Sequence, residues 1–364
     1  MKRLLCIISN LNQGGAETFL MKICRNLDKE KYAMDFCIMS DIHGVYEEEA
    51  LELGCKLYRV TPKSESFSKC LFGIHDIVKK YNYDSVIRVN QHAISVLDLI
   101  AAKLGGAKRL IMRSSNADSG SKKQRMLHKL FQFLPRTVPN VKIAPSIKAA
   151  EYTFGKRNVK KGKVNFLQNG LAVDDFTFNE GSRNNLRKEF NLEDKFIIGH
   201  IGRFQIQKNH KFLIDVFGEI LKQKENAHLV LVGGNGELLE ETKAYVTESG
   251  LDGCVTFLGN RSDVNQLLSA FDMLVFPSLY EGMPNVVIEA QAAGLPCLIS
   301  DTITPDADIT GLVEYYPLEK SAKEWADEAI VHASRFERRG YKEEFYTAGY
   351  DIEAVVQKFI DLVF

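Results

Sequence analysis

The strongest constraint on the fold is an alternation of short apolar runs with amphipathic segments, which occurs twice along the chain. Strands apolar over their whole length, alternating with helices, are typical of a parallel sheet covered on both faces. We therefore expect an α/β protein of two doubly wound, Rossmann-like domains facing a central cleft. The expected strands of the first half are 4–9, 35–39, 56–60, 85–89, 109–112, 142–144 and 164–167, with helices at 17–27, 46–53, 74–80, 95–104 and 122–133. Those of the second half are 196–202, 228–232, 255–258, 273–276 and 297–300, with helices at 210–222, 238–249, 263–270 and 286–293.

The boundary between the two halves is expected near residue 175. Single cores rarely grow past roughly 250–300 residues, and this chain has 364. A polar stretch at 174–185 separates the two alternations, and we interpret it as an interdomain linker. The expected domains are therefore 1–175 and 176–349, followed by an amphipathic helix near the C-terminus. In sheets of this kind, ligands bind at the carboxyl ends of the strands.

Composition narrows the class of function. Lys and Arg together number 47, as do Asp and Glu, so the net charge is zero and no nucleic-acid partner is indicated. The seven cysteines show no C-x-x-C spacing, which favours free thiols in a reducing compartment. No apolar run approaches the ~20 residues that span a bilayer. We expect a cytoplasmic protein, peripheral at most on the inner face of the plasma membrane.

The most informative stretch for function is 277–290, where an expected strand runs through a turn into a helix opening at Pro284 and Asn285. Glu281 precedes that opening and Glu289 lies inside the helix. A helix N-terminus attracts anions because its first N–H groups are unpaired. A carboxylate on each side can bind hydroxyls that flank a bound phosphate, which suits a sugar linked through phosphates to a nucleoside. The alternative is a surface loop with two solvated glutamates.

Glycine turns and cations follow other expected strands. Gly14 and Gly15 end the first strand, and turns of this kind bring backbone close to a ligand at a helix N-terminus. Arg can fork onto a phosphate and Lys adds a point charge. The alternatives to phosphate binding are tight strand–helix turns for the glycines and solvated surface charges for the Arg and Lys residues. The second-half candidates are Gly202, Arg203 and Lys208 after one strand, Gly233 in a second glycine turn, and the backbone of Leu258 and Asn260, which can read a base edge.

Taken together, these motifs resemble glycosyltransferase family 4, retaining enzymes of GT-B fold that include many bacterial capsule and exopolysaccharide transferases. The resemblance covers nearly the whole chain in order, and 299–304 is most similar to the exopolysaccharide branch. It rests on 14–17, Asn169-Gly170, Gly202-Arg203 with Lys208-Asn209, 233–236, Pro277-Ser278 and the Glu281/Glu289 pair in its Glu-Gly-x-Pro-x-x-x-x-Glu setting.

This resemblance implies a hexosyltransferase that uses a nucleotide sugar, with UDP as the expected nucleotide, and a saccharide or polyprenyl-linked glycan acceptor. The N-terminal domain would bind the acceptor, the C-terminal domain the donor, and the helix 350–364 would cross back onto the first domain. No metal and no cofactor would be required. The implied roles are diphosphate binding for Arg203, Lys208, Gly14 and Gly15, ribose binding for Glu289, and sugar binding for Glu281 and the backbone of Met283, Pro284 and Asn285.

The chain departs from the family at one position. Many relatives carry a histidine after the fifth strand, close to the donor sugar, where this chain has Ser115. Arg113, Asn116, His92 and Asn169 are the other candidates for the acceptor and sugar pocket. Two alternatives to a transferase remain: a UDP-sugar 2-epimerase of the same fold, and a non-catalytic partner subunit, which the missing histidine motivates.

A membrane-facing patch is expected at 122–136, where cations and apolar residues alternate with helical spacing. Such a helix can lie on an anionic bilayer, which fits a lipid-linked acceptor. The alternative is an ordinary helix whose apolar stripe packs on the N-terminal sheet.

Overall fold

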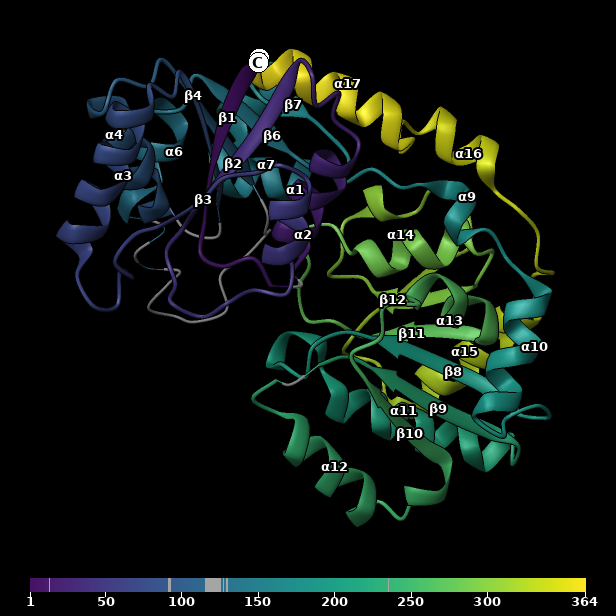
Figure 1. Ribbon diagram of the computed structural model, residues 1–364. Helices are drawn as coiled ribbons and strands as arrows, with labels where there is room; N and C mark the ends of the chain where they lie inside the picture. Colours follow the sequence, from purple (N-terminus) through teal and green to yellow (C-terminus); the bar gives the residue numbers. More distant parts are fainter. Residues whose placement is uncertain (13, 91–92, 115–125, 127, 129, 235) are drawn as a thin grey trace. The chain divides into compact units, whose positions relative to one another are not determined.

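The protein consists of two compact units, seen in a computed structural model that describes all residues except 13, 91–92, 115–125, 127, 129 and 235 (Figure 1). Unit 1 comprises Met1–Gly170 together with Gly349–Phe364, and unit 2 comprises Leu171–Ala348. Each unit holds its own parallel sheet. The expected α/β architecture with two Rossmann-like domains is thereby confirmed.

Unit 1 contains a seven-stranded sheet in the order β3-β2-β1-β4-β5-β6-β7, in which every neighbouring pair is parallel. Apolar strands such as Leu4–Ile8 are buried because helices cover both faces of the sheet. The strands are β1 (Lys2–Ile8), β2 (Tyr32–Ile38), β3 (Leu57–Arg59), β4 (Ser85–Asn90), β5 (Arg109–Ser114), β6 (Val141–Ala144) and β7 (Asn165–Phe166). The α-helices are α1 (Gly15–Arg25), α2 (Glu47–Glu52), α3 (Phe67–Tyr81), α4 (Val96–Leu104), α6 (Phe133–Thr137), α7 (Ile147–Phe154), α8 (Lys156–Lys160) and α17 (Ile352–Val363).

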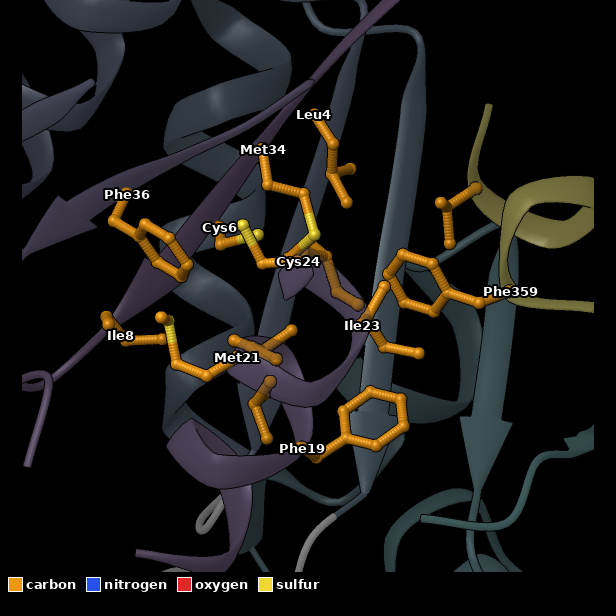
Figure 2. Packing of buried hydrophobic residues seen from close by; sticks show 14 of the residues in the cluster. Leu4, Cys6, Ile8, Phe19, Met21, Ile23, Cys24, Met34, Phe36 and Phe359 are labelled. Atoms are coloured by element: carbon orange, nitrogen blue, oxygen red, sulfur yellow. The ribbon is translucent and has the colours of Figure 1, made fainter. Parts of the chain in front are cut away.

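The C-terminal helix α17 belongs to the core of unit 1. Phe359 from α17 meets Phe19 from α1 edge to face, with ring centroids 5.9 Å apart (Figure 2). Asp351 caps the helix by accepting a hydrogen bond from the backbone N–H of Ala354 at 2.9 Å. Gly170 makes the close approach possible, since it has a φ of +67° and a Cβ there would lie 2.7 Å from the Cδ1 of Ile352.

Unit 2 contains a six-stranded parallel sheet in the order β10-β9-β8-β11-β12-β13. Its strands are β8 (Phe196–Ile201), β9 (Ala227–Val232), β10 (Val255–Gly259), β11 (Met273–Phe276), β12 (Cys297–Ser300) and β13 (Val313–Tyr316). Its α-helices are α9 (Val173–Phe176), α10 (Glu180–Glu189), α11 (His210–Gln223), α12 (Leu239–Glu248), α13 (Val264–Ala270), α14 (Asn285–Ala292), α15 (Ala322–Ser334) and α16 (Lys342–Thr347). Trp325 of α15 packs edge to face on Phe212 of α11 within its core.

The interpretation of 174–185 as a linker was wrong. This segment forms α9 and the first half of α10, and α10 is fastened to unit 2 by charge. Arg183 and Arg187 each donate to a carboxylate oxygen of Asp272, at 2.5 and 2.6 Å. Arg183 also donates to the backbone carbonyl groups of 269–271. Arg187 also donates to those of residues 270, 193 and 195. Ion pairs and hydrogen bonds to carbonyl groups hold α10 on unit 2, whereas other helices pack through an apolar stripe. The polar sequence of this helix therefore resembles that of a solvated linker.

Other differences concern elements that were not predicted and the residues at which predicted elements begin. Strand β13 and helix α15 were not predicted, and α3 begins at Phe67 rather than at 74. Half of the expected helix at 122–133 lies outside the described residues. No helix of the described part of the chain combines the length and apolar character that crossing a bilayer demands.

Candidate functional site

The strand order of unit 2 reverses between β8 and β11, which lie side by side although β9 and β10 intervene in the chain. In open parallel sheets, ligands bind outside the carboxyl ends of the strands at such a reversal. The loops concerned here are 202–209 after β8 and 277–284 after β11. They hold most of the candidate site residues of the second half.

Three hydrogen bonds to backbone carbonyl groups join these two loops to each other, in addition to a contact between Lys208 and Glu281. The backbone N–H of Leu279 donates to the carbonyl oxygen of Gln207 at 2.8 Å, and the Gln207 side chain donates back to the carbonyl of Tyr280 at 2.8 Å. Asn209, in the left-handed region with a φ of +56°, donates from Nδ2 to the carbonyl of Pro277 at 3.2 Å. The two loops therefore behave as one surface.

Lys208 and Glu281 form an ion pair across these loops. Nζ of Lys208 lies 2.7 Å from Oε1 of Glu281, and the side chains are only 18% and 9% exposed. The ammonium also lies 4.4 Å from the ring centroid of Phe276, within cation–π range. Partial burial strengthens such a pair, and removing either partner would leave a costly unpaired charge.

Arg203 differs from Lys208 in its surroundings. Its side chain is exposed, and its guanidinium has no hydrogen-bond or ion-pair partner among the residues that the structure describes. The site thus offers one cation already engaged by a carboxylate and a second that can bind an incoming anion directly. A diphosphate carries enough charge to engage both.

Glycines allow the loops after β8 and β9 to touch. A Cβ on Gly233 would lie 2.0 Å from the carbonyl oxygen of Gly202, and one on Gly236 would lie 2.1 Å from that of Phe204. Any side chain at either position would push the loop of Arg203 away from the sheet. The backbone of Leu258 and Asn260 lies at the carboxyl end of β10, where Gly259 turns the chain with a φ of +65°.

Helix α14 begins at Asn285, one residue after Pro284, which is the N-cap and contributes no side-chain cap. Glu289 lies in its second turn and is partly exposed, whereas Met283 is buried. The structure therefore places Glu281 before the helix and Glu289 within it, as the sequence indicated. Their spacing leaves the N-terminus of α14 between two carboxylates.

A buried histidine pair behind this surface was missed from the sequence. The rings of His200 and His210 lie 4.9 Å apart, and His210 stacks on Phe204 at 4.5 Å. Burial, with nearby Lys208 as a smaller cause, lowers the pKa of His210 to about 4. Burial likewise lowers the pKa of His200 well below its usual value. Both rings are therefore neutral at pH 7. The buried hydroxyl of Ser278, which follows β11, has no hydrogen-bond partner among the described residues. A single histidine in an apolar strand gives no signal of such a pair.

In unit 1, the structure brings together two of the acceptor-pocket candidates. Arg113 at the end of β5 is buried and donates from its guanidinium to Oδ1 of Asn169, 56 positions away in the chain. The same guanidinium lies 3.7 Å from the ring centroid of Phe19. Burial without a carboxylate partner in the described chain lowers its pKa. Arg113 is thus a desolvated cation at the carboxyl edge of this sheet.

The remaining candidates of unit 1 divide into two groups. Gly14 is the N-cap of α1 and Gly15 its first residue, so both lie at a helix N-terminus as expected. His92, Ser115 and Asn116 lie outside the described residues, as do 122–125, 127 and 129 of the patch at 122–136.

Comparison with known proteins identifies the family. The model of the family described as "Glycosyl transferases group 1" matches residues 195–332. The putative glycosyltransferase EpsF of Bacillus subtilis is 32% identical over 361 residues, which cover 97% of this chain and 94% of EpsF. The chain belongs to the group 1 glycosyltransferases. A second relative of this glycosyltransferase is an Escherichia coli enzyme named UDP-Gal:alpha-D-GlcNAc-diphosphoundecaprenol alpha-1,3-galactosyltransferase, 27% identical over 242 residues, 64% of this chain and 62% of that enzyme.

The fold of this glycosyltransferase is GT-B, as the resemblance implied. The crystal structure of Anabaena HepE in complex with UDP and glucose superposes with a TM-score of 0.78 and 18% identity, covering 99% of both chains. At that identity the likeness concerns the fold, and the site residues stay predictions.

The neutral histidines predict an acid-sensitive unit 2. A histidine whose folded pKa lies below its unfolded value of about 6.5 binds fewer protons when folded, so stability falls as pH drops from about 6.5 toward 4. His200, His210 and His228 all show such lowered pKa values. Each contributes a slope of up to about 1.4 kcal/mol per pH unit inside that window. Replacing His210 with Phe, which can keep the stack on Phe204, should reduce the loss of unfolding free energy between pH 7 and pH 5.

This is measured by urea unfolding at both pH values, with His43→Phe at an exposed position of unit 1 as control. Equal pH dependence for the wild-type protein and the His210→Phe variant would contradict the burial of a neutral imidazole.

Proposed function

We propose that this protein is a retaining hexosyltransferase that moves a hexose from a UDP-sugar to a saccharide or polyprenyl-linked glycan in cell-surface polysaccharide synthesis. The observation that carries the proposal is the largely buried ion pair of Lys208 and Glu281 at the strand-order reversal of unit 2, with Arg203 in the same loop as Lys208 and Glu289 in helix α14. The complexes of HepE with UDP and glucose, and the lipid-diphosphate acceptor named for the Escherichia coli relative, support the choice of substrates.

Charge balance assigns the donor roles. Arg203, exposed and unpaired within the described chain, binds the diphosphate, and Lys208 exchanges its contact with Glu281 for a phosphate oxygen. The exchange frees the Glu281 carboxylate to accept hydrogen bonds from hydroxyls of the donor sugar. Glu289 binds the ribose hydroxyls, and the backbone N–H groups at Met283–Asn285 face the sugar or its phosphate.

The reaction breaks the bond between the anomeric carbon and the leaving phosphate oxygen. The acceptor oxygen bonds to the same face of the sugar, and its proton passes to the departing phosphate. Fixed cations aimed at that phosphate stabilise charge that grows in the transition state. Two side-chain cations and a helix N-terminus supply this charge, so we propose that transfer requires neither a metal nor a cofactor.

Unit 1 takes the acceptor in this proposal. Gly14 and Gly15, at the N-terminus of α1, are its candidates for contact with the donor diphosphate. Arg113 and Asn169, joined by their hydrogen bond, orient a polar group of the acceptor or of the transferred sugar. His92, Ser115 and Asn116 remain candidates for the same pocket.

Removing either cation should slow transfer while affecting stability differently. We expect Arg203→Ala to cost about 2–4 kcal/mol of transition-state stabilisation, roughly 30- to 1,000-fold in kcat, without loss of folding stability, because its side chain is exposed. Lys208→Ala should cost as much activity and also lower the melting temperature, because it leaves Glu281 buried and unpaired. Lys222→Ala, an exposed lysine on α11, is the matched control.

The measurements are hydrolysis of UDP-sugars, with and without a chelator, and thermal shifts with UDP. A ligand at about 100 times its Kd adds about 2.7 kcal/mol of stability. Interconversion of UDP-sugar epimers without acceptor would favour the epimerase instead. Absence of hydrolysis, together with no effect of Glu281→Ala, would favour a non-catalytic subunit.

The membrane patch is a separate proposal. Within 122–136, Met126, Leu130 and Phe133 are 66%, 66% and 55% exposed. Their spacing of four and three residues places them on one face if the segment is helical. We expect co-sedimentation with anionic vesicles at low salt, weakened by high salt and by the double change Leu130→Ser with Phe133→Ser. Leu104→Ser, at another exposed leucine, should leave binding unchanged. Lack of co-sedimentation at low salt would refute the patch.

A further inference from the structure

A group of three potential metal ligands lies in unit 2, away from the donor residues. Glu314 of β13 and Glu328 and His332 of α15 each offer one ligand atom, and these atoms lie within 4.8 Å of one another. We propose that these three side chains bind a Zn²⁺ ion. Carboxylate oxygen and imidazole nitrogen are both ligands that Zn²⁺ accepts, and a tetrahedral site with three protein ligands keeps its fourth position open to water.

The backbone places the ligands for this role. Glu328 and His332 are four residues apart on α15, so their side chains lie on the same face of the helix. Glu314 is the second residue of edge strand β13 and is in register with Leu298 of β12. A shared ion would tie the last turns of α15 to the edge of the sheet.

The imidazole of His332 is already oriented as a ligand. The residue is 2% exposed, and Nε2 lies 2.9 Å from the carbonyl oxygen of Leu312. Since a carbonyl only accepts, Nε2 carries the proton and Nδ1 presents a lone pair. Nδ1 is buried and has no hydrogen-bond partner among the described residues. A second ring nitrogen that donates to a backbone carbonyl is the usual support of a metal-bound histidine.

Electrostatics at this point favours a cation. Two carboxylates meet near the C-terminal end of α15, where the helix dipole is negative. In the structure the charge is offset by Arg335, whose guanidinium nitrogens lie 3.6 Å from Glu314 and 3.3 Å from Glu328. Both distances exceed those of hydrogen-bonded ion pairs, and the arginine side chain is 47% exposed. An entering ion therefore displaces a weakly held surface side chain.

The site is separate from the proposed donor chemistry. Glu314 lies near the amino end of its strand, whereas Arg203 and Glu281 follow the carboxyl ends of β8 and β11. Binding is thus expected to raise the stability of unit 2 without being needed for transfer.

The test is Zn²⁺ titration of chelator-stripped full-length protein by calorimetry, with melting temperature as a second readout. We expect one Zn²⁺ per chain and a raised melting temperature. Glu314→Gln should weaken binding by more than the roughly 10–100-fold cost of changing an outer-shell partner. Arg335→Ala should tighten binding, because the competing guanidinium is gone. Glu319→Gln, at an exposed glutamate beyond β13, is the matched control and should change nothing.

Co²⁺ in place of Zn²⁺ identifies the ligands, because oxygen and nitrogen ligands lack the near-ultraviolet charge-transfer band of thiolates. This matters because the chain has seven free cysteines. Failure of both the wild-type and Arg335→Ala proteins to bind Zn²⁺ would overturn the proposal. So would binding that shows a thiolate band and is unaffected by Glu314→Gln. His332→Gln is informative only if folded, and Glu314→Gln decides the question if it is not.

Discussion

The ion pair between Lys208 and Glu281 is the interaction on which the proposed site depends. It joins the loops after β8 and β11 at the one place in unit 2 where the strand order turns. In water such a pair contributes little, but here both side chains are largely buried and the ammonium also rests on Phe276. The pair therefore holds both loops in position before any ligand arrives. A site formed in advance loses less entropy on binding.

The buried residues behind this ion pair add no positive charge to that of Lys208. His200 and His210 lie behind it as neutral imidazoles near pH 7, and Lys208 contributes to the lowering of the pKa of both. Two protonated imidazoles here would compete for the same anion and would be costly to bury. The core thus supplies aromatic packing without adding charge. Gly233 and Gly236 then let the loop of Arg203 lie directly on its neighbour.

The sequence predicted the fold well where strands are wholly apolar. The predicted bounds of Met273–Phe276 and Cys297–Ser300 agree with β11 and β12 to the residue. It failed at β13, whose edge position tolerates half-buried residues such as Glu314, and at α10, which arginines rather than apolar side chains hold. Hydrophobic periodicity predicts which apolar residues are buried, but it does not predict which charged side chains are buried.

Site prediction had a similar limit. Residue types and their places at strand ends pointed to Arg203, Lys208, Glu281 and Glu289, because strand ends share one edge of a parallel sheet. Contacts between residues far apart in the chain needed the structure. Lys208 and Glu281 are 73 positions apart, and no spacing rule pairs them. The contact between the buried rings of His200 and His210 could not be predicted from the sequence for the same reason.

The most direct test of the proposed donor site is a crystal structure of the protein with bound UDP. The account predicts a diphosphate held by Arg203 and Lys208 beside the loop of Gly202, a ribose on Glu289, and a Lys208 ammonium moved from Glu281 toward a phosphate oxygen. A nucleotide bound elsewhere, or a diphosphate in this position that neither cation contacts, would contradict it.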